Sequence, residues 1–278
     1  MSREVGQLYS VARMVLRPIF AFAWDIEVEG VENVPRHGGA IVAPNHLSVI
    51  DHFIVGAALP RRITYVGKAE YMDNWKTRHI FPALGMIPID RGGGSAADRA
   101  LSAAARLLGQ GELFGIYPEG TRSRDGRLHK GHTGVARLAL RTGCPIIPTG
   151  LQGTDVVQPA DHPFPRLFEC MRVRFGPPID VSRYQDRAED KLVLRQIADE
   201  VMYEIRNLTG QEYVDTYATK KKPGGGPPPP EHGRGVAEDE RTSTQAVAGA
   251  AAAELAAGDD ELDAPRRSSV AVLRPAGR

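Results

Sequence analysis

The chain has 278 residues, with 35 Lys and Arg against 34 Asp and Glu, so its formal net charge is +1. Hydrophobic residues at 42% and aromatic residues at 6% are ordinary for a globular protein. This balanced charge supplies no basic surface for a phosphate backbone, which argues against a nucleic-acid-binding protein. Cys144 and Cys170 are too few for a disulfide-stapled secreted domain, so a reduced, cytoplasmic environment is expected.

The N-terminal segment predicts an amphipathic helix. From Val5 to Phe22, apolar residues recur at helical spacing on one side, and arginines fall on the other. The most apolar stretch, 11–24, is shorter than the ~18 to 20 residues of a spanning helix and contains two arginines. It also lacks the pattern of a secretory signal peptide. Residues 1–24 are therefore predicted to pack on the core or to associate with a membrane, with Pro18 kinking or ending the helix.

Short apolar runs then alternate with helix-like segments. Strands are predicted at 40–43, 63–66, 86–89, 113–117, 145–149 and 171–175. Helices are predicted at 49–59, 96–108, 135–141 and 191–208, where apolar residues recur near a 3.6-residue period. The alternation indicates an α/β fold, and we expect one domain over residues 25–219 with a central mixed, largely parallel sheet flanked by helices.

The composition changes sharply at Lys220. A run of lysines leads into a Gly- and Pro-rich stretch at 224–230, followed by Ala-, Glu- and Asp-rich sequence with almost no large apolar residues. The alanine-rich part at 246–262 favours transient helix but has no apolar face wide enough to dock. Residues 220–278 are therefore predicted to be a disordered tail.

The first candidate for chemistry follows the strand at 40–43. His46 lies five residues before Asp51, and within one helix these positions would face apart, so His46 must lie outside the helix to meet the acid. Ser48 is predicted to cap the helix, with Asp51 folding back over the helix N-terminus. This explains Asp51 as a capping residue, and it is also compatible with a carboxylate that holds an imidazole N–H.

Two later strand ends carry arginines in glycine-containing turns. Arg91 precedes three glycines, and taken alone it is explained by a surface salt bridge. Basic residues crowd together after the strand at 113–117: Arg122, Arg124, Arg127 and Lys130. Arginine binds phosphate oxygens in a bidentate way, and glycine lets backbone N–H groups approach a ligand. This crowded segment predicts either a phosphate pocket or a solvated basic loop.

A fourth segment, 144–150, is an apolar strand containing Pro148. Because proline cannot donate a ladder hydrogen bond, the run by itself predicts an edge or terminal strand. All four segments lie at C-terminal ends of predicted strands, which is where open α/β sheets place their ligands.

The order and spacing of four motifs resemble a known family. The motifs are Asn45-His46-X4-Asp51, then Ile89-Asp90-Arg91, then Phe114-X-X-Tyr117-Pro118-Glu119-Gly120-Thr121-Arg122-Ser123, and then Ile146-Ile147-Pro148. The set resembles the glycerolipid acyltransferases of the 1-acyl-sn-glycerol-3-phosphate acyltransferase type, over about residues 26–178. Residues 25–219 are accordingly expected to be an acyltransferase domain.

The resemblance implies a role for each motif residue. His46 would be the general base that takes the proton of the acceptor hydroxyl, and Asp51 would stabilise the resulting imidazolium. The residues implied to bind the phosphate-bearing acceptor are Arg91, Glu119, Gly120, Thr121 and Arg122. Among them, Glu119 is expected to orient an arginine or a hydroxyl rather than to touch phosphate. Pro148 would form a wall beside the acyl donor, and Lys68 resembles a family position near the acceptor site.

The reaction implied by the resemblance is acyl transfer from acyl-CoA or acyl carrier protein to the free hydroxyl of 1-acylglycerol 3-phosphate, giving phosphatidate. The sequence contains no Gly-X-Ser-X-Gly elbow and no cysteine beside a plausible base, so direct transfer without an acyl-enzyme is expected. No cofactor or metal is implied beyond the thioester co-substrate. The lipid substrates imply a peripheral position on the cytoplasmic face of the cell membrane.

Three alternatives stay open. The acceptor is alternatively glycerol 3-phosphate, another lysophospholipid or a lipid without phosphate, and the two arginines Arg91 and Arg122 favour phosphate. His46, Asp51 and His52 have the spacing of metal ligands in a hydrolase, although no second cluster accompanies them. A non-catalytic lipid-binding scaffold, with the Pro-rich tail as a partner ligand, is the third alternative, and a general base would serve no purpose in it.

Overall fold

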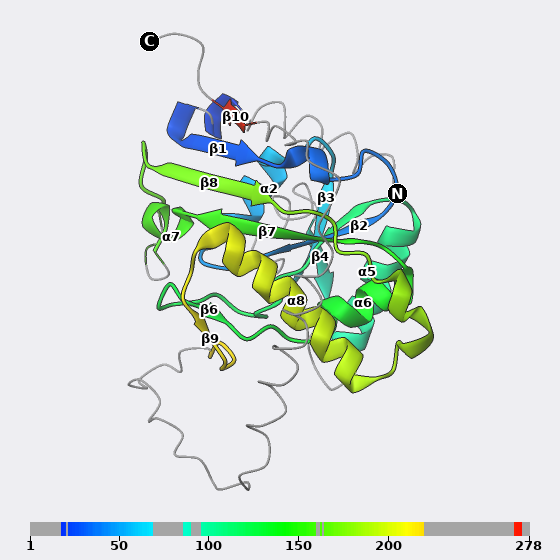
Figure 1. Cartoon of the computed structure of the whole chain (residues 1–278). Helices are drawn as coiled ribbons and strands as arrows, with labels where there is room; N and C mark the ends of the chain where they lie inside the picture. Colours follow the sequence, from blue (N-terminus) through cyan, green and yellow to red (C-terminus); the bar gives the residue numbers. More distant parts are fainter. Residues whose placement is uncertain are drawn as a thin grey trace, which may run out of the picture. The chain divides into compact units, whose positions relative to one another are not determined.

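A computed structural model describes residues 18–20, 22–68, 86–89, 96–159, 162, 164–219 and 270–273. Its centre is an eight-stranded sheet in the order β10-β1-β8-β7-β2-β5-β3-β4 (Figure 1). The bounds of these strands in chain order are Asp25–Glu29 (β1), Ala40–Pro44 (β2), Ile63–Lys68 (β3), Met86–Ile89 (β4), Leu113–Gly115 (β5), Ile146–Gln152 (β7), Cys170–Phe175 (β8) and Val270–Leu273 (β10).

Most neighbouring strands in this sheet run in the same direction. Strand β2 pairs parallel with β5 and β7, β3 pairs parallel with β4 and β5, and β1 pairs parallel with β8. The antiparallel pairs are β7 with β8 and β1 with β10. This arrangement confirms the expected α/β fold with a mixed, largely parallel central sheet.

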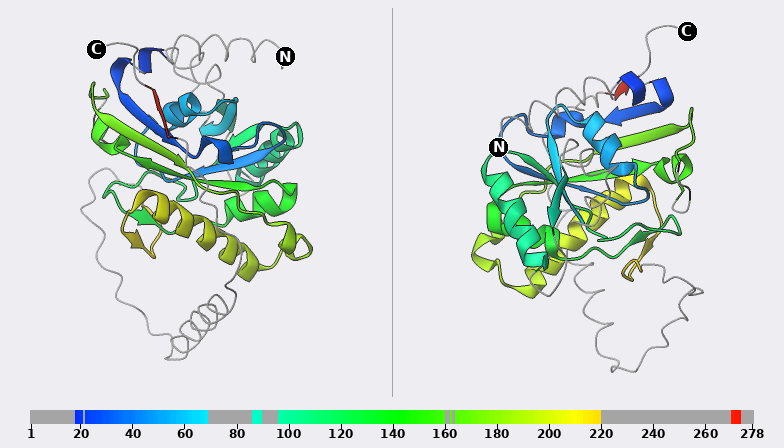
Figure 2. Two further views of the ribbon diagram at one scale, coloured as in Figure 1. Left: turned by 45° about the horizontal axis from the view of Figure 1, so that its top comes forward. Right: turned by 180° about the vertical axis from the view of Figure 1, so that it is seen from behind.

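Helices cover both faces of the sheet (Figure 2). Their bounds are Asp51–Ala58 (α2), Ala96–Gly109 (α5), Gly134–Thr142 (α6), Thr154–Val157 (α7) and Lys191–Thr209 (α8), with 3-10 turns at Val31–Asn33 (η1) and Ser182–Arg187 (η2). Helix α2 packs on one face, and α5, α6 and α8 pack on the other. A separate parallel pair joins β6 (Leu128–His129) to β9 (Tyr213–Val214).

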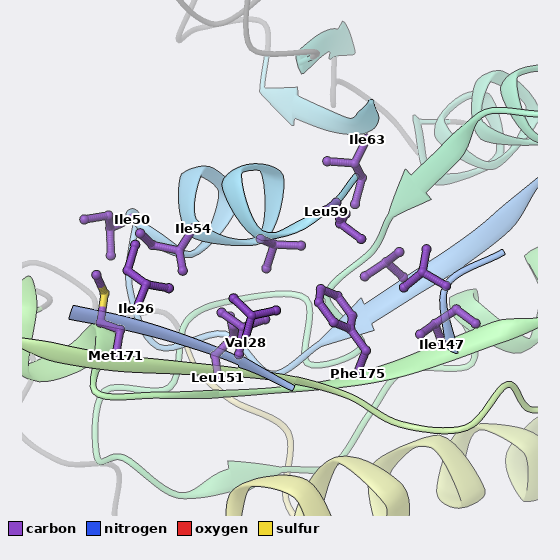
Figure 3. Close-up of a cluster of buried hydrophobic side chains, with 14 of the residues drawn as sticks. Ile26, Val28, Ile50, Ile54, Leu59, Ile63, Ile147, Leu151, Met171 and Phe175 are labelled. Carbon is purple, nitrogen blue, oxygen red and sulfur yellow. The ribbon is translucent and has the colours of Figure 1, made fainter. Parts of the chain in front are cut away.

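Alternation along the strands divides the apolar side chains between the two faces. In β2, Val42 joins the cluster beneath α2, whereas Ile41 and Ala43 join the cluster beneath α5, α6 and α8. Ile54 of α2 packs into the first cluster with apolar residues of β1, β7 and β8 (Figure 3). Burial on both sheet faces explains why these strands read as nearly continuous apolar runs.

The directions of the strands bring the expected site segments to one edge of the sheet. Strands β2, β3, β4, β5 and β7 run in the same direction, so the residues that follow them all emerge at the same edge. Strand β8 runs against β7, and β1 runs with β8, so both of these strands begin at that edge. Strand β10 runs against β1 and ends there too, so this edge collects the ends of six strands and the beginnings of two.

The prediction of an edge or terminal strand at Pro148 is wrong, because β7 lies between β2 and β8. The carbonyl of Pro148 accepts the N–H of Gly176 at 2.8 Å, just beyond the end of β8. The N and C=O of one strand residue point to the same side, so the missing N–H of Pro148 faces the place where the β7–β8 ladder stops. The proline therefore removes one terminal hydrogen bond, and the central position is tolerated.

Strand β1 is absent from the expected strands, although its sequence alternates apolar and acidic residues. Ile26 and Val28 point into the core, and Glu27 and Glu29 lie opposite Arg172 and Arg174 of β8. A hydrogen bond of 2.7 Å joins Arg172 Nε to Glu27 Oε2. The alternation with a period of two was therefore present in the sequence of β1. Its partner strand, β8, lies about 145 residues away in the chain.

At the N-terminal end the structure describes only part of the expected helix, and at the C-terminal end it differs from the expectation. Residues 18–20 and 22–23 are helical, and the rest of the expected N-terminal helix lies outside the described residues. Strand β10, Val270–Leu273, falls within the tail predicted to be disordered and pairs with β1. Its Val-Ala-Val-Leu sequence is the kind of β-prone run that adds to a free sheet edge. No helix in the described part of the chain is long and apolar enough to cross a membrane.

We expect Ile54→Ala to lower the free energy of unfolding by about 2–5 kcal/mol, because Ile54 is fully buried between α2 and the sheet. Urea denaturation followed by circular dichroism measures this change. Leu192→Ala is the matched control, since Leu192 is 78% exposed on α8 and should shift stability by no more than about 0.5 kcal/mol. Equal effects of the two substitutions would contradict the described core.

Candidate active site

The structure joins His46 to Asp51 at the end of β2. His46 Nδ1 lies 2.9 Å from Asp51 Oδ2, with the His46 side chain 13% exposed and Asp51 fully buried. Because a carboxylate only accepts hydrogen bonds, Nδ1 carries the proton of the neutral imidazole, and Nε2 keeps its lone pair. The pair therefore has the geometry of an oriented general base.

The carboxylate of Asp51 also holds the turn that presents His46. Its Oδ2 accepts the backbone N–H groups of Leu47 at 2.8 Å and Ser48 at 2.9 Å. The expected back-folded carboxylate is thus present. The expected Ser48 cap is not, because the Ser48 hydroxyl donates to the carbonyl of Gln158 at 2.7 Å and the helix begins at Asp51. A buried hydroxyl needs a partner, and here a distant loop supplies it.

The backbone of His46 is clamped by the turn that follows β5. The N–H of His46 donates to Glu119 Oε2 at 2.9 Å, and its carbonyl accepts the N–H of Ser123 at 2.7 Å. The other oxygen of Glu119 accepts the N–H of His129 at 3.0 Å. Glu119 therefore orients two backbone amides, in place of the arginine or hydroxyl expected from the sequence.

The shape of this clamp follows from its residues. The N–H of Gly120 donates to the carbonyl of Tyr117 at 3.0 Å, which closes a four-residue turn around Pro118 and Glu119. The φ angle of Glu119 is not positive, so the turn is of type I, with proline and glycine at their favoured positions. Gly120 itself has φ +70°, a conformation that glycine adopts without strain.

An aromatic cluster surrounds the His46 ring. Tyr117 stacks on His46 with ring centroids 3.9 Å apart and planes inclined by 23°. His52 meets His46 edge-on at 5.5 Å and Tyr65 at 4.9 Å. Tyr65 packs over Gly115, where an added Cβ would lie only 2.0 Å from the Tyr65 ring. The sequence analysis assigned no role to Tyr65 or Tyr117, and for Tyr65 nothing in the sequence signals one.

Burial decides the charge states around His46. It raises the pKa of Glu119 to about 7, although hydrogen bonds from the backbone of His129 and His46 favour the carboxylate. Burial, with a smaller contribution from the neighbouring His46, lowers the pKa of His52 to about 4. His52 is therefore neutral at pH 7.

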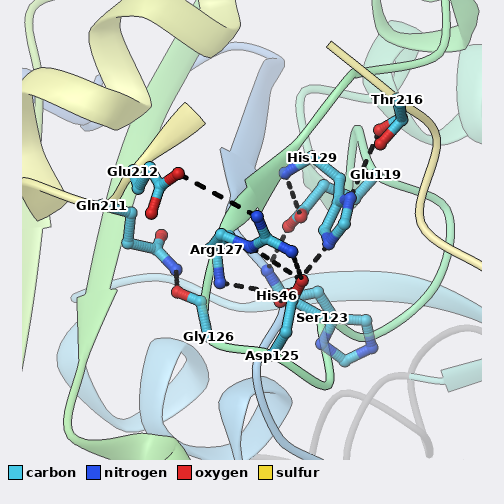
Figure 4. Close-up of polar contacts among 10 residues, drawn as sticks. All are labelled: His46, Glu119, Ser123, Asp125, Gly126, Arg127, His129, Gln211, Glu212 and Thr216. Carbon is cyan, nitrogen blue, oxygen red and sulfur yellow. Dashed lines mark hydrogen bonds and ion pairs between the residues drawn. The ribbon is translucent and has the colours of Figure 1, made fainter. Parts of the chain in front are cut away.

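Acidic residues neutralise part of the expected basic segment (Figure 4). Arg127 Nη2 lies 2.9 Å from Asp125 Oδ2, and Lys130 Nζ lies 2.8 Å from Asp215 Oδ1. Partial burial opposes the ionisation of Asp125, but hydrogen bonds from His129, Arg127 and Ser123 outweigh it and lower the Asp125 pKa. Arg122 makes no ion pair with any residue that the structure describes, so its charge is not neutralised there.

A strap formed by residues 211–217 holds the loop at 123–130 in place. Gln211 Nε2 donates to the carbonyl of Gly126 at 2.7 Å, and the N–H of Leu128 donates to the carbonyl of Glu212 at 2.9 Å. His129 Nδ1 lies 3.3 Å from the carbonyl oxygen of Thr216. These contacts link the segment after α8 to the loop that follows Glu119 and Arg122 in the chain.

The remaining expected site residues have different positions. Pro148 is in β7 beside Ala43 of β2. Lys68 ends β3 opposite Ile89, and its side chain lies outside the described residues, as does all of Arg91. Thr121 lies in the turn beside Arg122, half-buried.

Asn45 is a further site residue to which the sequence analysis gave no separate role. Its Oδ1 accepts the N–H of Leu151 at 2.7 Å, and its Nδ2 donates to the carbonyl of Leu151 at 3.0 Å. The fully buried amide thus joins the end of β2 to β7 one residue before His46. The structure does not assemble a metal site from the alternative ligands, since no group of three His, Cys, Asp or Glu in its described part has the geometry to hold an ion.

Part of the chain is similar in sequence to known acyltransferases. Residues 25–152 match the family model described as Acyltransferase. This part of the chain is therefore similar to acyltransferase domains. It is 34% identical over 139 residues to the 1-acyl-sn-glycerol-3-phosphate acyltransferase of Limnanthes douglasii, covering 50% of this chain and 49% of that protein. It is 28% identical over 148 residues to the Bacillus subtilis protein of the same name, covering 52% of this chain and 72% of that protein.

A solved structure shares the fold of this domain. It is the crystal structure of the 1-acyl-sn-glycerophosphate (LPA) acyltransferase, PlsC, from Thermotoga maritima. The two structures superpose with a TM-score of 0.55 at 24% sequence identity, covering 74% of this chain and 78% of that one. The chain spans about half the length of the Limnanthes relative.

We expect Glu119 to make the folded domain less stable as pH rises. The folded pKa of about 7 lies above the ordinary 4.5, so between these values the folded state binds more protons, and the free energy of unfolding falls with increasing pH. Glu119→Gln removes this titration and should flatten the decline between pH 5 and pH 7. Urea denaturation across this range measures it. The exposed Glu189→Gln variant should parallel the wild type, and an unchanged slope in Glu119→Gln would contradict the assignment.

Proposed function

We propose that this protein transfers a fatty acyl group from an acyl thioester to the free hydroxyl of 1-acylglycerol 3-phosphate, producing phosphatidate. The observation that carries the proposal is the 2.9 Å contact between His46 Nδ1 and the buried Asp51 carboxylate. Arg122 precedes Ser123, whose N–H donates to the His46 carbonyl. The names of the Limnanthes and Bacillus relatives give the same reaction for proteins with this domain.

His46 acts as the general base in this proposal. Nε2 takes the proton of the acceptor hydroxyl while the hydroxyl oxygen attacks the thioester carbonyl carbon. The new C–O bond forms, the C–S bond breaks, and the leaving thiolate receives the proton from the imidazolium. Asp51 stabilises the imidazolium between these two proton transfers and keeps the ring in one orientation.

Arg122 binds the acceptor phosphate in this proposal, together with Arg91 and the backbone of Gly120 and Thr121. A guanidinium without an ion-pair partner among the described residues is suited to a phosphate, because its fork of donors matches two phosphate oxygens. Glu119 supports this site indirectly by holding the backbone of His46.

The proposal includes the remaining substrates and the cellular position. The acyl donor is acyl-CoA or acyl carrier protein, and no further cofactor takes part. Pro148 forms part of the wall of the acyl-donor site, and Lys68 lies near the acceptor. Since the acceptor and product are lipids, the enzyme works at the cytoplasmic face of the cell membrane without spanning it.

We expect His46→Ala to reduce turnover by about 10²- to 10⁴-fold, which is the range supplied by a general base. The measurement is free-thiol release from palmitoyl-CoA and oleoyl-CoA with lysophosphatidate as acceptor, and lysophosphatidate binding should persist in the variant. Release that needs no acceptor would indicate a thioesterase. Absence of release with either acyl-CoA or acyl carrier protein as donor would leave a lipid-binding scaffold.

We expect Arg122→Ala to raise the KM for lysophosphatidate by about 10- to 100-fold, because a charge-assisted bond to phosphate is lost. Arg127→Ala is the matched control from the same loop, since Arg127 already pairs with Asp125 and should affect KM much less. Glycerol 3-phosphate and a phosphate-free lysolipid serve as the competing acceptors. Equal use of the phosphate-free lysolipid would contradict phosphate recognition by Arg122.

A further inference from the structure

Five large apolar side chains lie exposed in two short segments of the chain. Ile19 and Phe22 belong to the helical residues before β1, and they are 52% and 67% exposed. Phe164, Leu167 and Phe168 belong to the loop between α7 and β8, and they are 80%, 56% and 71% exposed. Single exposed apolar residues are common, but a group of five is not, and we refer to this group as the apolar rim.

The two segments of the apolar rim are joined to each other. The Phe22 and Phe168 rings meet edge-on with centroids 6.3 Å apart. The N–H of Phe168 donates to the carbonyl of Ala23 at 2.7 Å, and the indole N–H of Trp24 donates to the carbonyl of Arg166 at 2.6 Å. Phe168 has φ 64°, an unfavourable angle for a residue with a side chain. The backbone is therefore fixed in a way that keeps these rings in solvent.

The apolar rim lies at the same sheet edge as His46. The rim segments lead into the starts of β1 and β8, and those starts share an edge with the ends of β2 and β7. Figure 1 shows the helical residues before β1, helix α7 and the start of β8 together at one end of the sheet. The Ser48 hydroxyl, two residues beyond His46, donates to the carbonyl of Gln158 in the chain that leads to the rim loop.

The chemistry of the rim loop fits an anionic lipid surface. Arg166 is exposed between Phe164 and Phe168, whereas the acidic residue that follows, Glu169, is half-buried. Aromatic side chains that flank a cation bind bilayers by burying the rings among acyl chains and placing the cation at the anionic headgroups. In the proposed reaction, the acceptor and the product are themselves anionic lipids that reside in a bilayer.

We propose that the apolar rim inserts into an anionic lipid bilayer and so presents the His46 edge of the sheet to lipids in the membrane. This inference rests on the proposed function for its biological purpose, and its physical content is membrane binding, which is measured without turnover. Phe164 and Phe168 supply the insertion, and Arg166 supplies the attraction to headgroups.

The test uses the full chain and phosphatidylglycerol–phosphatidylcholine vesicles with no acyl donor present. The double variant Phe164→Ser with Phe168→Asn should bind these vesicles at least about tenfold more weakly in a flotation assay, because two rings no longer leave water. Asparagine is chosen at position 168 because it tolerates positive φ. The matched control Leu192→Ser removes an exposed apolar side chain from α8 and should bind as the wild type does.

Each further result supports or overturns the inference independently of the reaction. Arg166→Ala should weaken binding to phosphatidylglycerol vesicles and leave binding to pure phosphatidylcholine vesicles nearly unchanged. If the double variant binds vesicles as tightly as the wild type while its melting temperature is unchanged, the inference is overturned. It is also overturned if light scattering shows a wild-type dimer that the double variant loses, because the rim would then join two copies.

With activity present, the double variant should lose transfer to vesicle-borne lysophosphatidate and keep transfer to a short-chain, monomeric acceptor. Equal loss on both acceptors would overturn the inference, since the substitutions would then act on the active site rather than on membrane binding. Vesicle binding by a wild-type protein that transfers no acyl group would contradict the proposed function and leave the membrane surface standing.

Discussion

The structure of the site depends on one buried carboxylate. Asp51 is fully enclosed, and a single oxygen of its carboxylate accepts from the His46 imidazole and from two backbone amides. A buried charge is costly unless hydrogen bonds compensate it, so the turn between β2 and α2 must fold around the carboxylate. The same bonds that compensate the charge also orient the base. The same contacts therefore stabilise the turn and orient His46 for proton transfer.

The sequence predicted those features that depend on local pattern. The alternation of apolar runs and helical periods predicts the mixed sheet, and the five-residue spacing from His46 to Asp51 predicts that they meet outside the helix. The family motifs located the turn at 117–123, because proline and glycine at fixed positions of a type I turn leave a recognisable signature. Each of these signals lies within about ten residues of chain, where local geometry decides the outcome.

The features that escaped prediction depend on partners far away in the chain. Ser48 bonds to the carbonyl of Gln158, Glu119 bonds to the amides of His46 and His129, and Lys130 pairs with Asp215. The central position of Pro148 also depends on where β8 happens to end. The local sequence around these residues does not indicate which distant group they contact. The predicted Ser48 cap, the predicted partner of Glu119 and the predicted edge position of Pro148 were therefore wrong.

The strap at residues 211–217 extends the structural domain beyond the last helix that packs on the sheet. The match to the family ends at residue 152, and the last helix of the sheet layers ends at Thr209. A truncation after residue 210 would retain β1–β5, β7, β8 and the helices, yet it would remove β9, the partner of β6. It would thereby release the loop at 123–130, whose His129 shares the Glu119 carboxylate with the backbone of His46. Recombinant fragments and fusions of this domain therefore need residues up to at least 217, beyond the point where sequence similarity alone would place the end.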